Sequence, residues 1–321
     1  MSSVLILGHD DVVRLLPLRD CIDVMERALS ALARGELHNP LRSVVRPPAA
    51  QTLLGLMPAY RGGDEPLYAL KAVCIAPGNA ARGLDPHQGT VTLFDGATGE
   101  VRALLDASAI TSIRTAAVSA VATRALARPG ARVLAILGAG VQAASHLEAL
   151  RALRDWDEIR VWARTPERAR ALGIGVAVAA SAQEAVDGAD VICTTTSARE
   201  PVLRRDWLAA GVHINAVGSS IPTTRELDSA TIAAASLFVD RRESTENESG
   251  DYLFPLREGA IEPGHVRAEL GEVLIGAAPG RSSDDELTVF KSLGLAVEDL
   301  AAAEHVYRRA RETGVGLEVA F

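Results

Sequence analysis

Residues 133–143 read Val-Leu-Ala-Ile-Leu-Gly-Ala-Gly-Val-Gln-Ala. The five apolar residues are typical of a buried strand, and a helical pattern follows the two glycines. A strand that enters a helix through Gly-x-Gly-x-x-Ala is the sequence pattern of a dinucleotide-binding turn. Gly138 permits the tight turn, Gly140 lets a pyrophosphate approach the backbone, and Ala143 allows the helix to pack closely on the strand. The alternative interpretation is an ordinary strand–helix turn.

The segments downstream of this turn alternate between strand and helix patterns. Strands are predicted over 132–137, 158–163, 176–180, 189–194 and 212–217, and helices over 141–153, 166–171 and 183–186. This alternation predicts an α/β fold with a parallel, doubly wound Rossmann sheet. Val141 and Gln142 begin the first of these helices, where free N–H groups favour phosphate binding.

The end of the second strand indicates which dinucleotide binds. An NAD site usually has Asp or Glu here to bind the ribose hydroxyls. This chain instead has Arg164 and Thr165, with Arg168 one helical turn later. Guanidinium groups bind a 2′-phosphate, which a carboxylate would repel. We therefore expect NADPH as the cofactor, with NADH as the weaker alternative, unless both arginines are merely solvated residues at a helix start.

Two later strands end in small polar residues. Thr195 follows one of them, and Val217 and Gly218 follow the other. Ligands of such sheets bind beyond the carboxyl ends of the strands, so these residues are candidate cofactor contacts. For each residue taken singly, a loop rich in turn-forming residues explains the pattern equally well.

The N-terminal third of the chain has a different pattern. Residues 10–34 predict an amphipathic helix. Extended runs over 43–46, 52–58, 68–75, 89–94 and 101–105 predict a mixed sheet, with a hairpin turn at 95–99. Residues 106–127 predict a helix that is apolar on all sides and therefore buried. The stretch 284–313 predicts a last helix.

Three cations lie where the local pattern is apolar. Lys71 occupies a strand whose two faces are both apolar, Arg114 lies in the buried helix, and Arg42 precedes an extended run. An unpaired buried cation costs several kcal/mol, so each needs an anion nearby. If no protein carboxylate supplies that anion, the carboxylate of a substrate can. The alternatives are a structural ion pair or, for Lys71, an edge strand whose amine reaches water.

The composition narrows the class of protein. The net charge of −8 lacks the basic surface expected of a protein that binds nucleic acid or anionic membranes. The three cysteines have no paired spacing, which argues against disulfides and a zinc site and fits a reducing compartment. No segment has eighteen consecutive apolar residues, so no membrane span is expected. We expect a cytoplasmic enzyme that binds no metal.

The chain resembles the ornithine cyclodeaminase/μ-crystallin family. In chain order, the segments that carry the resemblance are Pro40–Arg42, Gly55–Tyr60, Lys71, Leu104–Asp106, Thr111–Ser119, Leu137–Gln142, Asn215–Gly218 and Phe290–Gly294. The resemblance implies a homodimer of two-domain chains. Residues 1–118 with 299–321 would form a domain for substrate binding and dimerisation, and residues 119–298 would form the Rossmann domain.

The resemblance also implies roles for single residues. Arg42, Lys71 and Arg114 would bind a substrate carboxylate. The expected cofactor contacts are Thr115 at the phosphates and, near the nicotinamide, Val217, Gly218, Ser292 and Leu293.

One position departs from the cyclodeaminases. Those enzymes carry an aspartate in a Gly-Gly-Asp-x-Pro segment, where it handles the substrate amine, whereas residues 218–222 read Gly-Ser-Ser-Ile-Pro and place Ser220 there. The chain is more similar to the ketimine reductase branch of the family. That branch shares the serine, a His-Gln pair like His87–Gln88, and an Arg-Thr pair after the second strand.

The resemblance therefore implies NADPH-dependent reduction of Δ1-pyrroline-2-carboxylate or Δ1-piperideine-2-carboxylate to L-proline or L-pipecolate. A protonated imine is the better electrophile, so an acid near the substrate should help. Lys71 is the first candidate for this acid and His87 the second, although a loop histidine is often structural. The alternatives are an ornithine cyclodeaminase, an alanine dehydrogenase-like enzyme, and a non-catalytic protein that binds NADPH.

Overall fold

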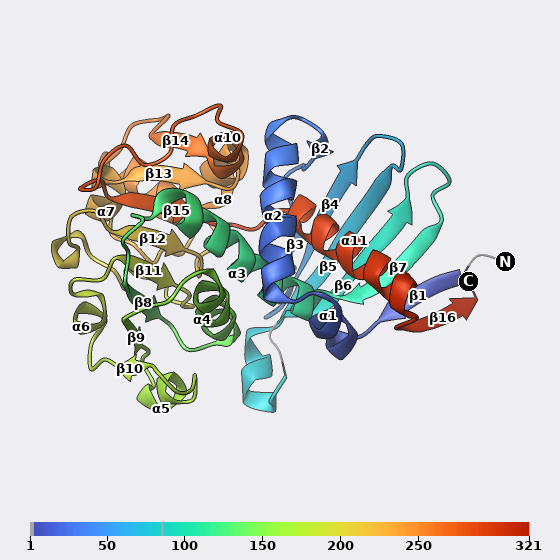
Figure 1. Cartoon of the computed structure of the whole chain (residues 1–321), viewed down its shortest axis with the longest axis horizontal. Helices are drawn as coiled ribbons and strands as arrows, with labels where there is room; N and C mark the ends of the chain where they lie inside the picture. Colours follow the sequence, from blue (N-terminus) through green and yellow to red (C-terminus); the bar gives the residue numbers. More distant parts are fainter. Residues whose placement is uncertain (1–2, 85–86, 321) are drawn as a thin grey trace. The chain divides into compact units, whose positions relative to one another are not determined.

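The computed structural model describes residues 3–84 and 87–320. The chain divides into two compact units, one comprising residues up to 114 together with those from 295, the other residues 115–294 (Figure 1). Each boundary lies four residues before the one expected from the sequence. The first boundary falls within helix α3 (Ala107–Leu126), so the two units share one continuous helix.

The first unit is built on an eight-stranded sheet. Its strands run in the order β16-β1-β7-β6-β5-β4-β2, with β3 also paired to β4. Neighbouring strands are antiparallel except β1 and β7. The elements of this unit besides α3 are β1 (Ser3–Leu7), α1 (His9–Leu15), α2 (Leu18–Ala33), β2 (Leu37–His38), β3 (Ser43–Val45), β4 (Leu53–Arg61), β5 (Leu67–Ile75), the 3-10 helix η1 (Pro77–Arg82), β6 (His87–Asp95), β7 (Val101–Asp106), α11 (Ala296–Thr313) and β16 (Leu317–Ala320).

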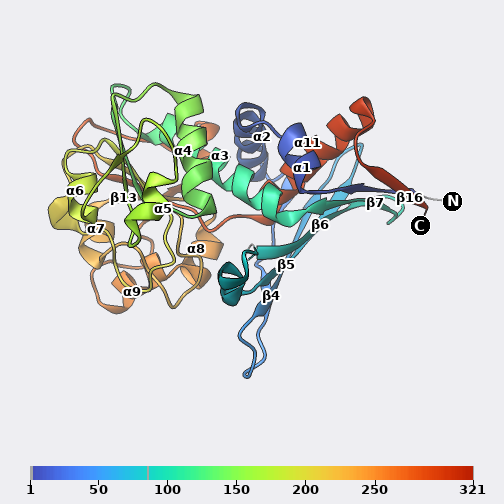
Figure 2. The ribbon, with the colours of Figure 1, turned by 90° about the horizontal axis from the view of Figure 1, so that it is seen from below.

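Helices cover one face of this sheet. Figure 2 shows α1, α2 and α11 on the same side of strands β4 to β7, and α11 packs against β4, β5, β6 and α2. Because side chains alternate along a strand, Ala69, Lys71 and Val73 of β5 face these helices and are buried. From α2, Met25 and Leu29 are buried as well, each contributing about 1.5–3 kcal/mol of hydrophobic stabilisation.

The single helix expected over residues 10–34 is wrong. The structure has two helices, α1 and α2, separated at Leu16 and Pro17. Proline lacks the N–H group that an interior helical position donates, and it disfavours helical geometry in the residue before it. Pro17 therefore ends one helix and caps the start of the next.

The second unit is the predicted Rossmann fold, which is confirmed. Its sheet has eight strands, all parallel, in the order β10-β9-β8-β11-β12-β15-β13-β14. The elements are β8 (Val133–Leu137), α4 (Val141–Leu153), β9 (Glu158–Trp162), α5 (Pro166–Arg170), β10 (Ala177–Val178), α6 (Ala182–Val186), β11 (Val191–Thr194), the 3-10 helix η2 (Arg205–Trp207), β12 (His213–Ala216), α7 (Ser229–Ala234), β13 (Ser236–Val239), α8 (Arg242–Glu248), α9 (Gly250–Arg257), β14 (Val266–Glu269), α10 (Leu270–Leu274) and β15 (Thr288–Lys291).

The helix expected over residues 284–313 is correct only in its C-terminal part. Residues 288–291 form β15, a fully buried strand between β12 and β13, and the helix begins at Ala296. A short apolar run does not by itself distinguish a buried strand from a buried helix. Here Thr288, Val289 and Phe290 are β-branched or aromatic, which favours the strand.

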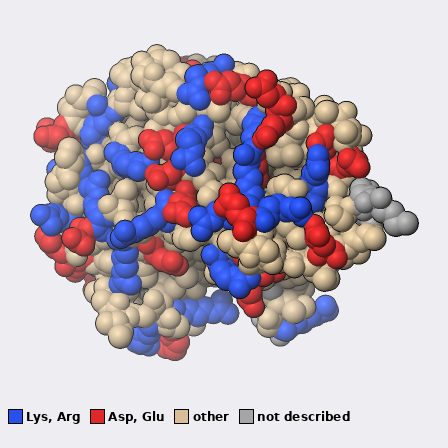
Figure 3. Space-filling view, turned by 45° about the vertical axis from the view of Figure 1, so that its right-hand side comes forward, with Lys and Arg blue, Asp and Glu red and all other residues tan. Residues whose placement is uncertain are grey.

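None of the described helices is long and apolar enough to cross a membrane. Acidic and basic side chains are interspersed on the face shown in Figure 3. Helix α3 is apolar on nearly every side and is buried over most of its length, as the pattern predicted.

Candidate active site

Two of the three predicted cations are buried together in the first unit. Lys71 is 3% exposed and Arg114 is 4% exposed. Lys71 Nζ lies 2.6 Å from Asp299 Oδ2, and Arg114 Nε donates to the other oxygen of the same carboxylate at 3.0 Å. Arg114 Nη1 donates to Glu298 Oε2 at 2.7 Å. Helix α11 therefore supplies carboxylates to both cations, which is the structural ion pair that the sequence left open as an alternative.

The N-terminus of α11 explains why these carboxylates can be buried. Asn39 Oδ1 accepts the Val297 N–H at 3.1 Å, and Glu298 Oε2 accepts the Leu295 N–H at 3.2 Å. Negative side chains are stabilised at a helix N-terminus by the helix dipole. The first turn of α11 thus holds Glu298 and Asp299 against Arg114 and Lys71.

Arg42 lies near the same cluster. Arg42 directly precedes β3, in which Ser43 pairs with Leu56 of β4. The next residue of β4, Met57, is the partner of Lys71 in β5. The positive charge of Arg42 contributes to lowering the pKa of Lys71. The first unit therefore brings together all three residues predicted to bind substrate. With Glu298 and Asp299, these five side chains carry three positive and two negative formal charges.

The pKa of the Lys71 amine is shifted toward neutral pH. Burial lowers the pKa of its amine from 10.5 to about 8, and the carboxylate of Asp299 partly opposes this shift. Its ammonium group also donates to Thr111 Oγ1 at 3.5 Å. An amine with a pKa of about 8 can lose or gain a proton at physiological pH, which is the property required of a general acid or base.

His87, the second candidate acid, lies on the same face of the sheet but further along it. It begins β6 opposite Ile75, whereas Lys71 pairs with Val91. Four residues along a strand span about 13 Å. His87 is exposed, and the structure does not bring it into the buried cluster.

The glycine turn of the second unit has the geometry of a dinucleotide site. Gly138 has φ of +126°, and a Cβ there would lie 2.6 Å from Thr195 Oγ1. A Cβ placed at Gly140 would meet no described atom within 4 Å, so the backbone is open to a ligand at this point. Gly140 caps α4, whose first N–H groups, from Val141 onward, have no carbonyl partner within the helix. The turn therefore fits a pyrophosphate.

The other predicted cofactor residues of this unit follow the carboxyl ends of adjacent strands. Thr195 follows β11, Val217 and Gly218 follow β12, and Ser292 and Leu293 follow β15. Since β8, β11, β12 and β15 are neighbours and parallel, these loops share one edge of the sheet. Chain connectivity reverses direction between β8 and β11, which is where doubly wound sheets bind nucleotides.

Arg164 and Arg168 lie beyond the end of β9 and are exposed. Neither guanidinium has an ion-pair partner among the described residues. Thr165 occupies the N-cap position of the short helix α5, which contains Arg168. Their exposure is compatible with a phosphate site and with simple solvation. Thr115, expected at the cofactor phosphates, is buried in α3 and is the first residue of the second unit.

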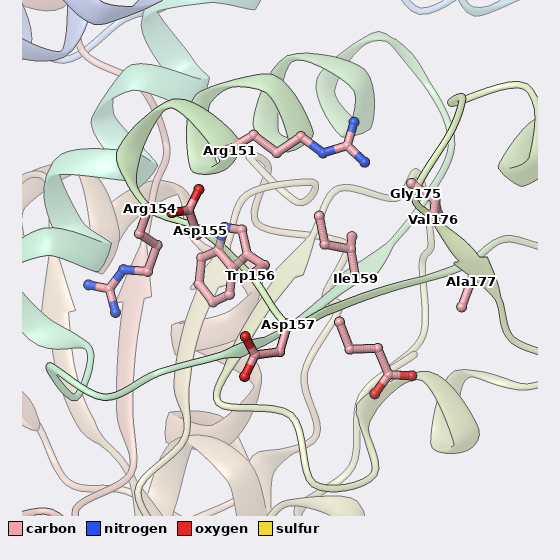
Figure 4. Close-up of a pocket in the computed structure, with 10 residues that line it drawn as sticks. Arg151, Arg154, Asp155, Trp156, Asp157, Ile159, Gly175, Val176 and Ala177 are labelled. Atoms are coloured by element: carbon pink, nitrogen blue, oxygen red, sulfur yellow. The ribbon is translucent and has the colours of Figure 1, made fainter.

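One depression of the described structure lies elsewhere. It measures about 690 Å³ and is lined by Arg151, Arg154, Trp156 and Asp157, among others, at the amino end of β9 (Figure 4). None of the predicted site residues lines it. Its walls carry both acidic and basic groups in the open, so it lacks the enclosed apolar character of a substrate pocket.

The sequence interpretation missed six buried charged residues: Glu226, Asp240, Asp251, Lys291, Glu298 and Asp299. Asp240 accepts the backbone N–H groups of Leu293 and Gly294 at 2.6 and 2.7 Å, and so shapes a predicted cofactor loop. A signal for the lysines was available. Only two of the 33 basic residues are lysine, Lys71 and Lys291, and both are buried.

Comparison with known proteins gives a consistent result. The model of the ornithine cyclodeaminase/mu-crystallin family matches residues 3–314. Ketimine reductase mu-crystallin of Mus musculus is 44% identical over 293 residues, which cover 89% of this chain and 90% of that protein.

Two solved structures superpose closely. Δ1-pyrroline-2-carboxylate reductase of Thermococcus litoralis, in complex with NADH and L-proline, has a TM-score of 0.94 and 37% identity, covering 98% of this chain and all of that one. An archaeal alanine dehydrogenase dimer with bound NAD has a TM-score of 0.94 and 33% identity, with complete coverage of both chains. The chain belongs to the ornithine cyclodeaminase/μ-crystallin family.

Proposed function

We propose that this protein is an NADPH-dependent reductase of a small cyclic imino acid, Δ1-pyrroline-2-carboxylate or its six-membered homologue. The observation that carries the proposal is Lys71, a buried amine tuned to a pKa of about 8, in a chain that also has a complete dinucleotide turn. The relatives named for pyrroline-2-carboxylate and ketimine reduction support the same reaction.

The substrate carboxylate is bound by Arg42, Lys71 and Arg114. Lys71 and Arg114 also pair with Glu298 and Asp299, so the substrate carboxylate would join this network of buried charges. Arginine binds a carboxylate through two parallel hydrogen bonds, which also orients the ring. Holding the reactants in one geometry removes much of the entropic barrier to reaction.

Lys71 supplies the proton. Reduction of an imine adds a hydride to carbon and a proton to nitrogen, and bound reduced nicotinamide supplies the hydride. The ammonium group of Lys71, held by Asp299, protonates the imine nitrogen or keeps it protonated. His87 is the weaker candidate because it is exposed and lies outside the buried cluster.

The cofactor is bound by the second unit. Gly138, Gly140, Val141 and Gln142 bind the pyrophosphate, and the loops after β11, β12 and β15 surround the nicotinamide. Arg164, Thr165 and Arg168 select NADPH over NADH through the 2′-phosphate. The two solved relatives described above contain NADH and NAD, so the preference for NADPH is proposed from the residues of this chain alone.

The active form is a homodimer joined through the sheet of the first unit. The face of this sheet opposite α11 carries apolar side chains that remain partly exposed, among them Leu54, Tyr68, Leu70 and Phe94. A second copy of the chain would bury this face, and the archaeal alanine dehydrogenase is a dimer. The cytoplasmic location expected from the sequence remains a prediction.

The decisive experiment measures NADPH and NADH oxidation with a panel of five- and six-membered cyclic imino acids. We expect turnover with at least one ring size and a preference for NADPH. Lys71→Ala should lower kcat by about 10²- to 10⁴-fold while NADPH still binds. Release of ammonia from ornithine would favour a cyclodeaminase, and NADH formation from alanine would favour an alanine dehydrogenase. Tight NADPH binding without turnover of any imine would indicate a non-catalytic binding protein.

A further inference from the structure

The carboxylate of Glu226 joins two loops at the carboxyl edge of the Rossmann sheet. Its side chain is fully buried and accepts four hydrogen bonds. Oε1 accepts from the backbone N–H and the hydroxyl of Thr196 at 2.6 and 2.7 Å. Oε2 accepts from Thr194 Oγ1 and from the Gly218 N–H, both at 2.7 Å. One side chain therefore holds the loop after β11 and the loop after β12.

A buried ion pair holds Glu226 in turn. Asp251 Oδ1 accepts the backbone N–H groups of Glu226 and Leu227 at 2.8 and 3.0 Å. The other oxygen of Asp251 lies 3.0 Å from Lys291 Nζ at the end of β15, and both side chains are 1% exposed. The network thus connects the ends of three adjacent strands: β11, β12 and β15.

The groups around Glu226 suit an ionised carboxylate. Burial raises the pKa of Glu226, and the positive charge of Lys291 opposes this rise. Each oxygen accepts from one backbone N–H group, which can only donate, so a proton on that oxygen would place a second donor against it. The loops also pack tightly, since a Cβ at Gly218 would lie 2.2 Å from the Thr196 carbonyl oxygen and 2.5 Å from Glu226 Oε1.

The positions of the two lysines also draw attention to this network. The surface cations of this chain are arginines, and lysine occurs only at 71 and 291. Each lysine is buried and faces a buried aspartate from another element. An arginine side chain is bulkier, ends in a planar group and does not lose its proton. Arginine is therefore not equivalent to lysine at positions 71 and 291.

We propose that Glu226, held by Asp251 and Lys291, is a positioning residue that sets the Thr194–Thr196 and Gly218 loops for the nicotinamide half of the cofactor. This inference rests on the proposed function only in placing the nicotinamide at these loops. Glu226 does not touch the reacting atoms. It acts through the backbone groups that it fixes.

The test compares Glu226→Gln with Asp190→Asn. Asp190 also accepts two backbone N–H groups, those of Arg132 and Val133 at 2.7 and 2.9 Å, but at the opposite, amino edge of the sheet. Both substitutions put an amide against N–H donors, so both should lower Tm. Glu226→Gln should also weaken NADPH binding and lower kcat/KM by roughly 10- to 100-fold. Asp190→Asn should change both constants less than about twofold.

Two further variants keep the proposal testable if Glu226→Gln fails to fold. Glu226→Asp retains the charge and should recover part of the lost kcat/KM. Lys291→Met removes the cation that pairs with Asp251 at the end of β15. Like Glu226→Gln, it should weaken cofactor binding. Equal losses of kcat/KM in Glu226→Gln and Asp190→Asn, in proportion to their losses of Tm, would overturn the proposal.

Cofactor affinity separates this proposal from the proposed reaction. The dissociation constants of NADPH and NADH are measured by quenching of the fluorescence of the three tryptophans. If the protein reduces no cyclic imine, the proposed reaction fails, while the contrast between Glu226→Gln and Asp190→Asn in cofactor affinity still decides the role of Glu226.

Discussion

At the scale of single residues, Asp299 contacts both buried cations of the first unit. Its negative charge raises the pKa of Lys71 against the effect of burial. In Asp299→Asn this support is lost, so the pKa of Lys71 should fall below about 8. Because reduction requires the protonated amine, kcat/KM decreases as pH rises through this pKa. We expect the alkaline limb of the pH profile to move to lower pH.

Glu298→Gln is the matched control for this shift. It removes the same charge from the same helix turn, but Glu298 bonds to Arg114 and to the Leu295 N–H. Its alkaline limb should stay closer to that of the unmodified protein. The free imine substrate titrates at the same pH whichever variant is assayed, so its own pKa does not contribute to a difference between the pH profiles of the variants. An unchanged limb in Asp299→Asn would show that Lys71 is not the proton donor.

Arg164 and Arg168 determine the cofactor preference in our proposal. Replacing both with alanine removes the groups that bind the 2′-phosphate. A hydrogen bond to a charged group contributes about 1.5–3 kcal/mol, so the KM for NADPH should rise at least about tenfold. The KM for NADH should change little. Arg170→Ala on the same short helix, where Arg170 pairs with Glu167, is the control and should leave the preference intact.

At the scale of elements, the two glycines of the β8–α4 turn have separable roles. Gly138→Ala places a Cβ against Thr195 at an unfavourable φ, so it should lower Tm and abolish tight cofactor binding. Gly140 has φ of −97° and open space around a Cβ. Gly140→Ala should therefore preserve Tm and weaken only NADPH binding, as measured by thermal unfolding and fluorescence titration. Equal losses of Tm in both variants would refute this division of roles.

Element boundaries were predictable where local chemistry decides them. The helix predicted over 141–153 has the bounds found in the structure, because the glycine turn fixes its start. The segment 288–291 was misassigned because a strand buried on both faces has no alternating pattern. The strands that pair with it, β12 and β13, come from residues 213–216 and 236–239, so the pairing that makes this segment a strand is not local in sequence.

At the scale of the whole molecule, the open sheet face of the first unit predicts self-association. Leu70→Glu puts a charge in the middle of this face and should convert a dimer of twice 33.8 kDa into a monomer. Light scattering coupled to size exclusion measures the mass. Ile174→Glu, at an exposed apolar position in the other unit, is the control and should remain dimeric. A dimer that survives Leu70→Glu would place the interface elsewhere.

The candidate site was predictable in part. Lys71 and Arg114 were identified because a cation in an apolar segment is unusual in any fold. Their partners were not identified, because Glu298 lies 184 residues after Arg114 and has an ordinary place in the first turn of a helix. For the same reason the sequence could not decide between a protein carboxylate and a substrate carboxylate as the partner of these cations.

Local pattern alone specified the Rossmann unit, its glycine turn and the apolar setting of the cations, since these depend on neighbours within a few residues. Tertiary structure decided how the buried charges are paired. Asp299 meets Lys71 and Asp251 meets Lys291 only because distant elements return to the same core. Charge pairing in a core depends on distances through space, which the order of residues along the chain does not contain.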